Sequence, residues 1–181
     1  MSKGARKMAY QELYDKYTAL LSDKAECQDS LAILKQGYIS TKRINGNTYT
    51  YLQYRINGKL KSEYVKDDHL PEVCAQLDKR RVLRKRINEI DAELKKLESA
   101  AGVLDKDLYR KLTILRRCAA VETMPLEERA KSLAFGSAMT ALEGIPLSRE
   151  TEQNLSRWIE GDIRFLESFL NTLQTYHLAG V

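Results

Sequence analysis

The chain has 181 residues, of which 43% are hydrophobic and 30% charged, and only 9 glycines and 3 prolines, a composition typical of a helix-rich globular protein. No apolar run approaches the ~20 residues of a membrane-spanning helix, and no apolar stretch follows the basic N-terminus as it would in a signal peptide. Three cysteines without C-x-x-C spacing are typical of reduced thiols, so we expect a cytoplasmic protein.

The net charge of +5 conceals an uneven distribution of charge along the chain. Residues 1–120 contain 25 Lys and Arg against 16 Asp and Glu, whereas residues 121–181 contain 5 against 9. Such asymmetry indicates different partners for the two parts, or contact between them.

Two long segments have apolar residues at alternating spacings of three and four, the pattern of a helical seam. The seam over residues 10–34 is interrupted only at Lys24, and the seam over residues 73–97 is interrupted at Gln76 and Arg80. Each segment is about 28 residues, or roughly 42 Å of helix. We therefore expect an antiparallel helical hairpin or coiled coil, and the alternative is a homodimer through the same seams.

The segment between the two seams, "GYISTKRINGNTYTYLQYRINGKLKSEYV", predicts a β-meander. Two Asn-Gly pairs, at 45–46 and 57–58, are flanked by β-forming residues, which is the strongest short signal for a hairpin turn. We expect strands over residues 38–44, 48–56 and 59–65. One face of the meander should pack on a helix, because an isolated meander is only marginally stable.

The remaining residues have helical patterns. We expect helices over 105–120 and about 125–143, another that begins at Ser148 as its N-cap, and a further one after a bend at Gly161. The fold class is therefore mainly α: a long helical hairpin with a three-stranded meander between its helices, followed by a small helical C-terminal unit. We expect the domain boundary near residue 99, with domains 1–99 and 100–181.

Residue patterns for catalysis or metal binding are lacking in the sequence. Neither His69 nor His177 has a metal-ligand partner at helical spacing, and no G-x-S-x-G, H-E-x-x-H or Walker-type loop occurs. We therefore expect a protein that is not an enzyme and that uses no cofactor or metal.

The meander and the following helix form a candidate nucleic-acid interface. Cations beside tyrosines suit phosphate contact and base stacking, and "DKRRVLRKR" at 78–86 has six cations in nine residues. The alternative is that tyrosines are simply good strand formers and charged helix faces are solvated. The candidate residues are Lys42, Arg43, Tyr54, Lys59, Lys61, Arg80, Arg81, Arg84, Lys85 and Arg86.

The same region, "GYI…YTYLQYRINGKLKSEYV" followed by "LRKRINEIDAEL", is similar to a family of small uncharacterised bacterial proteins that are often linked to mobile elements. That family has a G-x-hydrophobic strand, an aromatic Y-x-Y strand and a "GK" hairpin. The resemblance implies a bacterial or phage origin.

The C-terminal stretch "ALEGIPLSRETEQNLSRWIEGDI" resembles the VbhA family of antitoxins, over roughly residues 125–175. These small helical proteins restrain Fic-domain AMP-transferases, and their helix before Leu-Glu-Gly inserts beside the toxin's nucleotide site. The family glutamate pairs with a toxin arginine that would otherwise hold the ATP γ-phosphate. The resemblance implies that Glu143 has this inhibitory role, framed by Leu142 and Gly144.

One position departs from the family pattern. The inhibitory motif has Ser or Thr four residues before the glutamate, whereas this chain has Met139 there, and Thr140 stands three residues before Glu143. Thr140 is the candidate substitute, because positions three and four residues apart share a helix face. A carboxylate at a helix C-terminus is also unfavourable by roughly 0.3–1 kcal/mol, so Glu143 needs a cation, either from a partner or from Arg149 or Arg157.

The leading hypothesis is therefore a non-enzymatic, antitoxin-like inhibitor that masks the nucleotide site of a Fic-type AMP-transferase, with that toxin or another effector protein as partner. The alternative is a nucleic-acid-binding or phage or mobile-element inhibitor protein that acts on DNA or RNA through the meander and the basic helix. A structural coiled-coil adaptor is a third reading. We expect no membrane partner.

Overall fold

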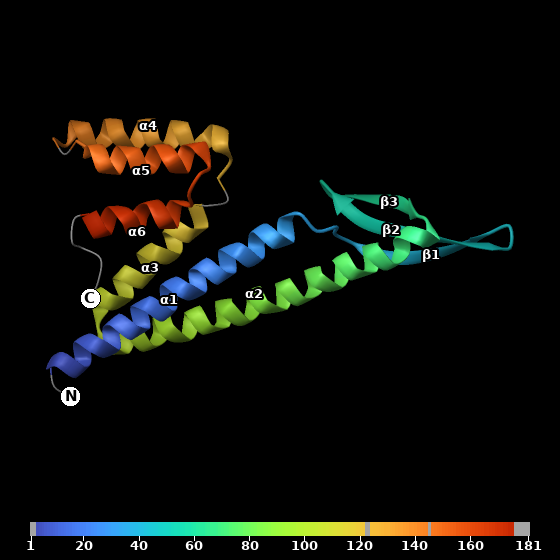
Figure 1. Ribbon diagram of the computed structural model, residues 1–181, viewed down its shortest axis with the longest axis horizontal. Helices are drawn as coiled ribbons and strands as arrows, with labels where there is room; N and C mark the ends of the chain where they lie inside the picture. Colours follow the sequence, from blue (N-terminus) through green and yellow to red (C-terminus); the bar gives the residue numbers. More distant parts are fainter. Residues whose placement is uncertain (1–2, 122–123, 145, 176–181) are drawn as a thin grey trace. The chain divides into compact units, whose positions relative to one another are not determined.

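The computed structural model describes residues 3–121, 124–144 and 146–175. These ranges contain six α-helices and one three-stranded sheet, which lies between the first two helices in the chain, as predicted (Figure 1). The helices are α1 (Lys3–Ala32), α2 (Leu70–Leu104), α3 (Lys106–Ala120), α4 (Leu126–Leu142), α5 (Arg149–Glu160) and α6 (Phe165–Thr175). The strands are β1 (Tyr38–Ile44), β2 (Asn47–Ile56) and β3 (Lys59–Val65), and a short 3-10 turn (Asp67–His69) precedes α2.

The chain divides into two compact units, and helices α1 and α2 each contribute to both. One unit, Ser22–Glu93, contains the sheet with the end of α1 and the beginning of α2. The other combines residues up to Leu21 with the described residues from Leu94 onward. Helix α2 continues to Leu104, and the expected boundary between domains 1–99 and 100–181 stays a prediction.

The sheet is an antiparallel meander in the order β1-β2-β3, with the strands almost where the sequence predicts them. Both Asn-Gly turns have positive φ at both residues, 50° and 85° in the first and 49° and 77° in the second. These values are those of a type I′ turn, whose twist matches that of the flanking strands. The two dipeptides therefore fix the register of the whole sheet.

One face of the sheet packs on the beginning of α2. Leu52 and Val65 from the sheet and Val73 from α2 form the buried cluster of this unit. Partly buried apolar side chains surround the cluster: Ile39, Tyr54, Leu70 and Leu77. The predicted packing of a lone meander on a helix is therefore confirmed.

A glycine is required at position 37, directly before β1, because the backbone of β2 lies very close to it. Its φ is +120°, which side-chain-bearing residues rarely adopt, and a Cβ at this position would collide with the carbonyl of Gln53 on β2. Only glycine allows the chain to enter the sheet here.

Helices α1 and α2 run antiparallel within the Ser22–Glu93 unit, and the polar residues that interrupt the seams form the contacts between them. Lys24 Nζ lies 2.6 Å from Asp91 Oδ1, and Arg80 donates to the carbonyl oxygens of Leu31 and Leu34 at 2.7 and 3.1 Å. The third interruption, Gln76, accepts a hydrogen bond from a backbone amide beyond α1 at 3.3 Å. The two seams are therefore paired within one chain.

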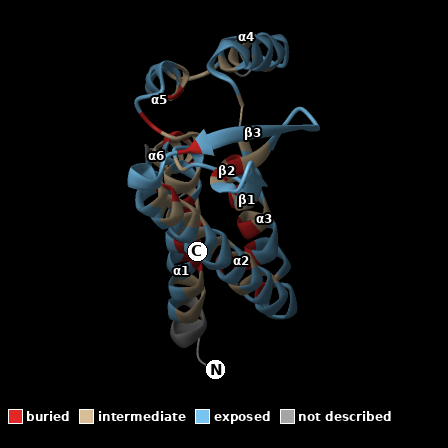
Figure 2. Cartoon of the chain, turned by 90° about the vertical axis from the view of Figure 1, so that its right-hand side faces the viewer, coloured by how far each residue is buried: buried red, intermediate tan, exposed pale blue. Residues whose placement is uncertain are grey.

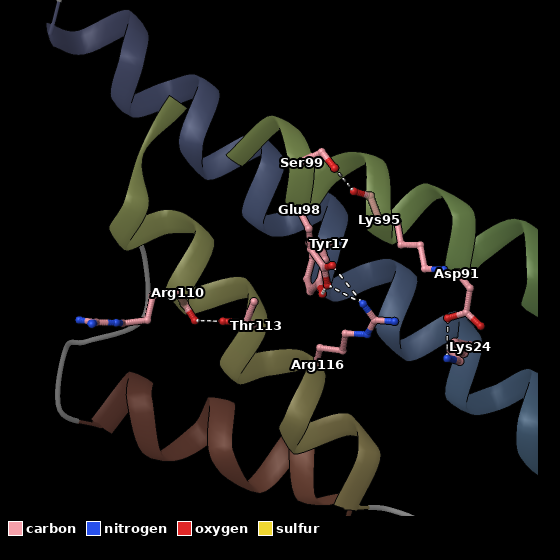
Figure 3. Close-up of polar contacts among 9 residues, drawn as sticks. All are labelled: Tyr17, Lys24, Asp91, Lys95, Glu98, Ser99, Arg110, Thr113 and Arg116. Atoms are coloured by element: carbon pink, nitrogen blue, oxygen red, sulfur yellow. Dashed lines mark hydrogen bonds and ion pairs between the residues drawn. The ribbon is translucent and has the colours of Figure 1, made fainter. Parts of the chain in front are cut away.

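In the other unit, a polar network joins α1, α2 and α3 (Figure 3). The fully buried Tyr17 donates its hydroxyl proton to Glu98 Oε1 at 2.6 Å, and Arg116 Nη1 lies 3.0 and 3.1 Å from the two oxygens of Glu98. Burial, followed by the hydrogen bond to Glu98, raises the pKa of Tyr17 well above its ordinary value.

Helices α3, α5 and α6 form the rest of this unit's described core. Asp105 caps α3 by accepting from the amides of Asp107 and Leu108, and Ser148 caps α5 through the amide of Thr151. The buried Trp158 of α5 meets the ring of Phe165 of α6 edge-on, with centroids 4.8 Å apart. The core-facing residues of α3 are all buried: Leu108, Leu112, Leu115 and Cys118.

Candidate functional site

The inhibitory motif predicted from the sequence lies at the C-terminal end of α4, where Glu143 is the C-cap residue. The chain turns away at Gly144, which has a φ of +75°. Glu143 is exposed, and although its backbone amide donates to the carbonyl oxygen of Met139 at 3.2 Å, its carboxylate makes no hydrogen bond or ion pair with any described residue. Neither Arg149 nor Arg157 pairs with it, although both belong to described residues. The carboxylate therefore stands at the unfavourable end of its helix dipole without a cation from the described residues.

The neighbouring face of α4 is apolar and solvent-exposed. Phe135, Met139 and Leu142 stand at i, i+4 and i+7, so their side chains follow one stripe of the helix. Their exposed fractions are 70%, 44% and 83%, and no described residue of α4 is buried. Figure 2 shows α4 almost entirely in the colours of exposed and intermediate residues. We call Phe135, Met139, Leu142 and Glu143 the α4 surface.

Thr140, the predicted substitute for the family Ser or Thr, does not position Glu143 in this structure. Its hydroxyl donates to the carbonyl oxygen of Ser137 at 3.1 Å, within its own helix.

Helix α4 is held to α5 mainly near its beginning. Arg129 donates to the carbonyl oxygens of Met124 and Trp158 at 3.1 and 2.9 Å, and its guanidinium lies 5.3 Å from the centroid of the indole ring. Arg129 thus fixes the N-terminal half of α4, while the α4 surface lies toward the other end.

The structure separates the candidate nucleic-acid-binding residues of the sheet onto two faces. The face that packs on α2 contains Tyr54, which stands two residues after Leu52 on β2. By the strand register, the same face contains Lys61, Lys59 and Arg43. Lys42 lies on the opposite face. Tyr54 packs beside the apolar cluster rather than standing free for stacking.

The opposite face of the sheet, which we call the outer face, gathers tyrosines. Tyr64 makes edge-to-face contacts with Tyr49 and Tyr51, with centroids 6.0 and 5.8 Å apart, and the ammonium of Lys42 lies 4.9 Å from the centre of the Tyr51 ring. None of the strand residues on this face, all of them described, is acidic.

Most cations of the basic stretch 78–86 are engaged within the Ser22–Glu93 unit. Arg81 lies 3.3 Å from Asp78, and Lys85 lies 3.9 Å from Glu89. Arg86 pairs with Asp23 of α1, and this pair raises the pKa of the guanidinium and lowers the pKa of the carboxyl. Arg80 binds the end of α1, as described above. Arg84 is exposed and has no ion pair with a described acidic residue.

Features of a metal site or a membrane span are absent from the described ranges. Within them, no group of three or more His, Cys, Asp or Glu side chains is placed to hold a metal ion. The same residues include no helix long and apolar enough to cross a membrane. His69 lies exposed in the 3-10 turn before α2, and His177 is outside the described residues.

Sequence reasoning missed Phe135 as part of the candidate site, and it also missed Tyr64. The i, i+4, i+7 spacing of the α4 surface was visible in the sequence, but such a stripe ordinarily predicts core packing. The pairing of Tyr64 with Tyr51 follows from the register, which the Asn-Gly turns already fix.

Comparison with known proteins identifies a family model that covers part of the chain. Residues 9–75 match the model of a family described as a domain of unknown function (DUF6788). The match includes the whole sheet and most of α1, and it ends before the basic stretch and the α4 surface. No curated protein matches the chain, and no solved structure does.

Proposed function

We propose that this chain is a non-enzymatic protein inhibitor whose α4 surface docks on a partner, and that the partner is a Fic-type AMP-transferase. The observation that carries the proposal is Glu143, an exposed carboxylate at a helix C-terminus with no cation from the described residues. An arginine supplied by a partner would offset the unfavourable interaction with the helix dipole.

The apolar stripe beside Glu143 supports protein docking. Phe135, Met139 and Leu142 provide large apolar side chains next to the carboxylate. Aromatic residues and methionine are enriched at the cores of protein interfaces, and an ion pair surrounded by such residues is shielded from water. The resemblance of residues 125–175 to the VbhA antitoxins proposes the nucleotide site of a Fic domain as the surface that these side chains cover.

The test is inhibition of a Fic-domain AMP-transferase from the same genome by the full chain. Truncation of one member of a buried charged pair costs about 2–5 kcal/mol. The inhibition constant of Glu143→Ala should therefore rise about 30-fold or more. Glu152→Ala, an exposed carboxylate on α5, is the matched control and should inhibit like the wild type. Equal inhibition by Glu143→Ala and Glu152→Ala, or none by the wild type, would reject the proposal.

A second candidate function, binding of single-stranded nucleic acid, is favoured by the outer face. Three tyrosine rings and Lys42 lie together there with no carboxylate on the face, a combination suited to base stacking and phosphate attraction. The test is a mobility shift with a short oligonucleotide at low and high salt. Tyr51→Ala should weaken the complex, and affinity should fall linearly with the logarithm of salt concentration. The absence of a shift at ~50 mM salt would remove this candidate.

A further inference from the structure

A cavity in the Ser22–Glu93 unit lies where the chain enters the sheet beside α2. Its volume is about 460 Å³, within the range of small-molecule sites. Gly37, Tyr38 and Ile39 at the start of β1 form one wall. The other wall is a stretch of α2 comprising Cys74, Leu77, Asp78, Arg80, Arg81 and Arg84.

The three arginines of this cavity are in different states. Arg80 donates Nη1 to two backbone carbonyls, but its Nε is buried and has no hydrogen-bond partner. Arg81 forms an exposed ion pair with Asp78, which lines the same cavity. Arg84 has no acidic partner among the described residues. The cavity is therefore lined by Arg84, which has no described acidic partner, and by Arg80, which donates to two carbonyls and keeps one buried donor without a partner.

An unused buried donor is unfavourable, and so is the proximity of two like charges. Burial and the nearby charge of Arg84 lower the pKa of Arg80. A bound anion would relieve both penalties, because guanidinium groups bind phosphate oxygens through paired N–H donors.

We propose that this cavity binds a nucleoside phosphate, with Arg80 and Arg84 on the phosphate and Tyr38 beside the base. The apolar residues Ile39 and Leu77 and the tyrosine ring suit a planar base, which a site for inorganic anions alone would not need. The proposal does not depend on the α4 surface, and it uses Tyr38 of the outer face but not the contacts of Tyr64 with Tyr49 and Tyr51. The phosphate is supplied either by a free nucleotide or by a nucleic-acid strand.

The experiment is calorimetric titration of the full chain with ATP, inorganic phosphate, adenosine and a ten-residue oligonucleotide. ATP or the oligonucleotide should saturate, inorganic phosphate should bind more weakly, and adenosine should not bind. Arg84→Gln should weaken binding about tenfold or more, whereas the matched control Lys79→Gln, an exposed cation on the same helix that does not line the cavity, should change it less than twofold. Tyr38→Ala should weaken ATP binding more than phosphate binding.

A second readout does not depend on any variant. Cys74 lines the cavity, so a bound ligand should slow its alkylation, followed by mass spectrometry, while the buried Cys118 serves as the internal reference. Protection by ATP identifies a free nucleotide, and protection by the oligonucleotide alone identifies a strand. Binding of neither, equal affinities of Arg84→Gln and Lys79→Gln, or alkylation of Cys74 unaffected by saturating ligand would overturn the proposal.

Discussion

Helices α3 and α4 have similar lengths and similar numbers of large apolar side chains, yet they use them in opposite ways. On α3, Leu112 is fully buried and the other core-facing residues are nearly so. On α4, Phe135 and Leu142 are 70% and 83% exposed, and none of its described residues is buried. The core-facing residues of α3 contribute to folding of the chain, whereas Phe135 and Leu142 of α4 are exposed to solvent.

The difference also appears in the polar contacts of the two helices. Arg116 of α3 is bound to Glu98, which in turn accepts the hydroxyl proton of the buried Tyr17. Glu143 at the end of α4 has no corresponding cation within the described residues. A charge that is paired internally stabilises the fold, and a charge left unpaired beside an apolar stripe is suited to an external partner.

The largest expected effect is the difference between α3 and α4 in how much truncation of an apolar side chain lowers the free energy of unfolding. Leu112→Ala should lower the free energy of unfolding by about 2–5 kcal/mol, because it removes a fully buried side chain and leaves a cavity. Phe135→Ala should change it by less than ~0.5 kcal/mol, because the ring is mostly in water. Urea unfolding followed by circular dichroism measures both, and similar losses for the two variants would contradict the comparison.

An intermediate effect concerns the buried network at alkaline pH. The unfolded chain releases the Tyr17 proton near pH 10, whereas the folded chain retains it because its pKa is raised. The stabilisation is therefore complete below pH 10 and is lost above it, by up to about 1.4 kcal/mol per pH unit. Unfolding measured from pH 9 to 11 should show a shallower decline for Tyr17→Phe than for the wild type. Tyr64→Phe, which alters a half-exposed ring, should keep the wild-type slope.

The smallest expected effect shows whether the carboxylate of Glu143 destabilises the folded chain. Glu143→Gln should leave stability unchanged or raise it by up to about 1 kcal/mol, because it removes a negative charge from a helix C-terminus. Glu128→Gln, at the beginning of the same helix, should lower stability by a similar amount. A clear loss of stability in Glu143→Gln would mean that the carboxylate serves the fold rather than a partner.

The secondary structure was predictable because local signals agree with tertiary packing. The Asn-Gly turns fixed the meander, and Ser148 marked the start of α5 through its own side chain. The helical pairing followed from the seams, and the interruptions at Lys24 and Arg80 proved to be contacts between the helices. Such contacts are invisible in one helix read alone, because the partner is more than forty residues away.

The candidate sites were less predictable. Apolar periodicity states which face of α4 is apolar but not whether another element covers it, so Phe135 could not be distinguished from Leu112. The basic residues of the sheet were close in sequence, but strand alternation and register place Lys42 and Lys61 on opposite faces. Cations of the basic stretch are largely used within the chain, and for Arg80 and Arg86 this use is revealed by the positions of the end of α1 and of Asp23.

The close approach of the β2 backbone to Gly37 restricts the substitutions that natural variants of this sequence can carry. The hairpin tips have open space around them, whereas a single added methyl at Gly37 would meet the backbone of β2. At the tips the positive φ of the glycines is the constraint, whereas at position 37 the backbone of β2 adds a steric one, so substitutions should be eliminated most strictly at position 37 among natural variants that keep this architecture. Because Gly37 also lines the cavity between the start of β1 and α2, the same constraint would preserve the shape of that cavity even where its side chains diverge.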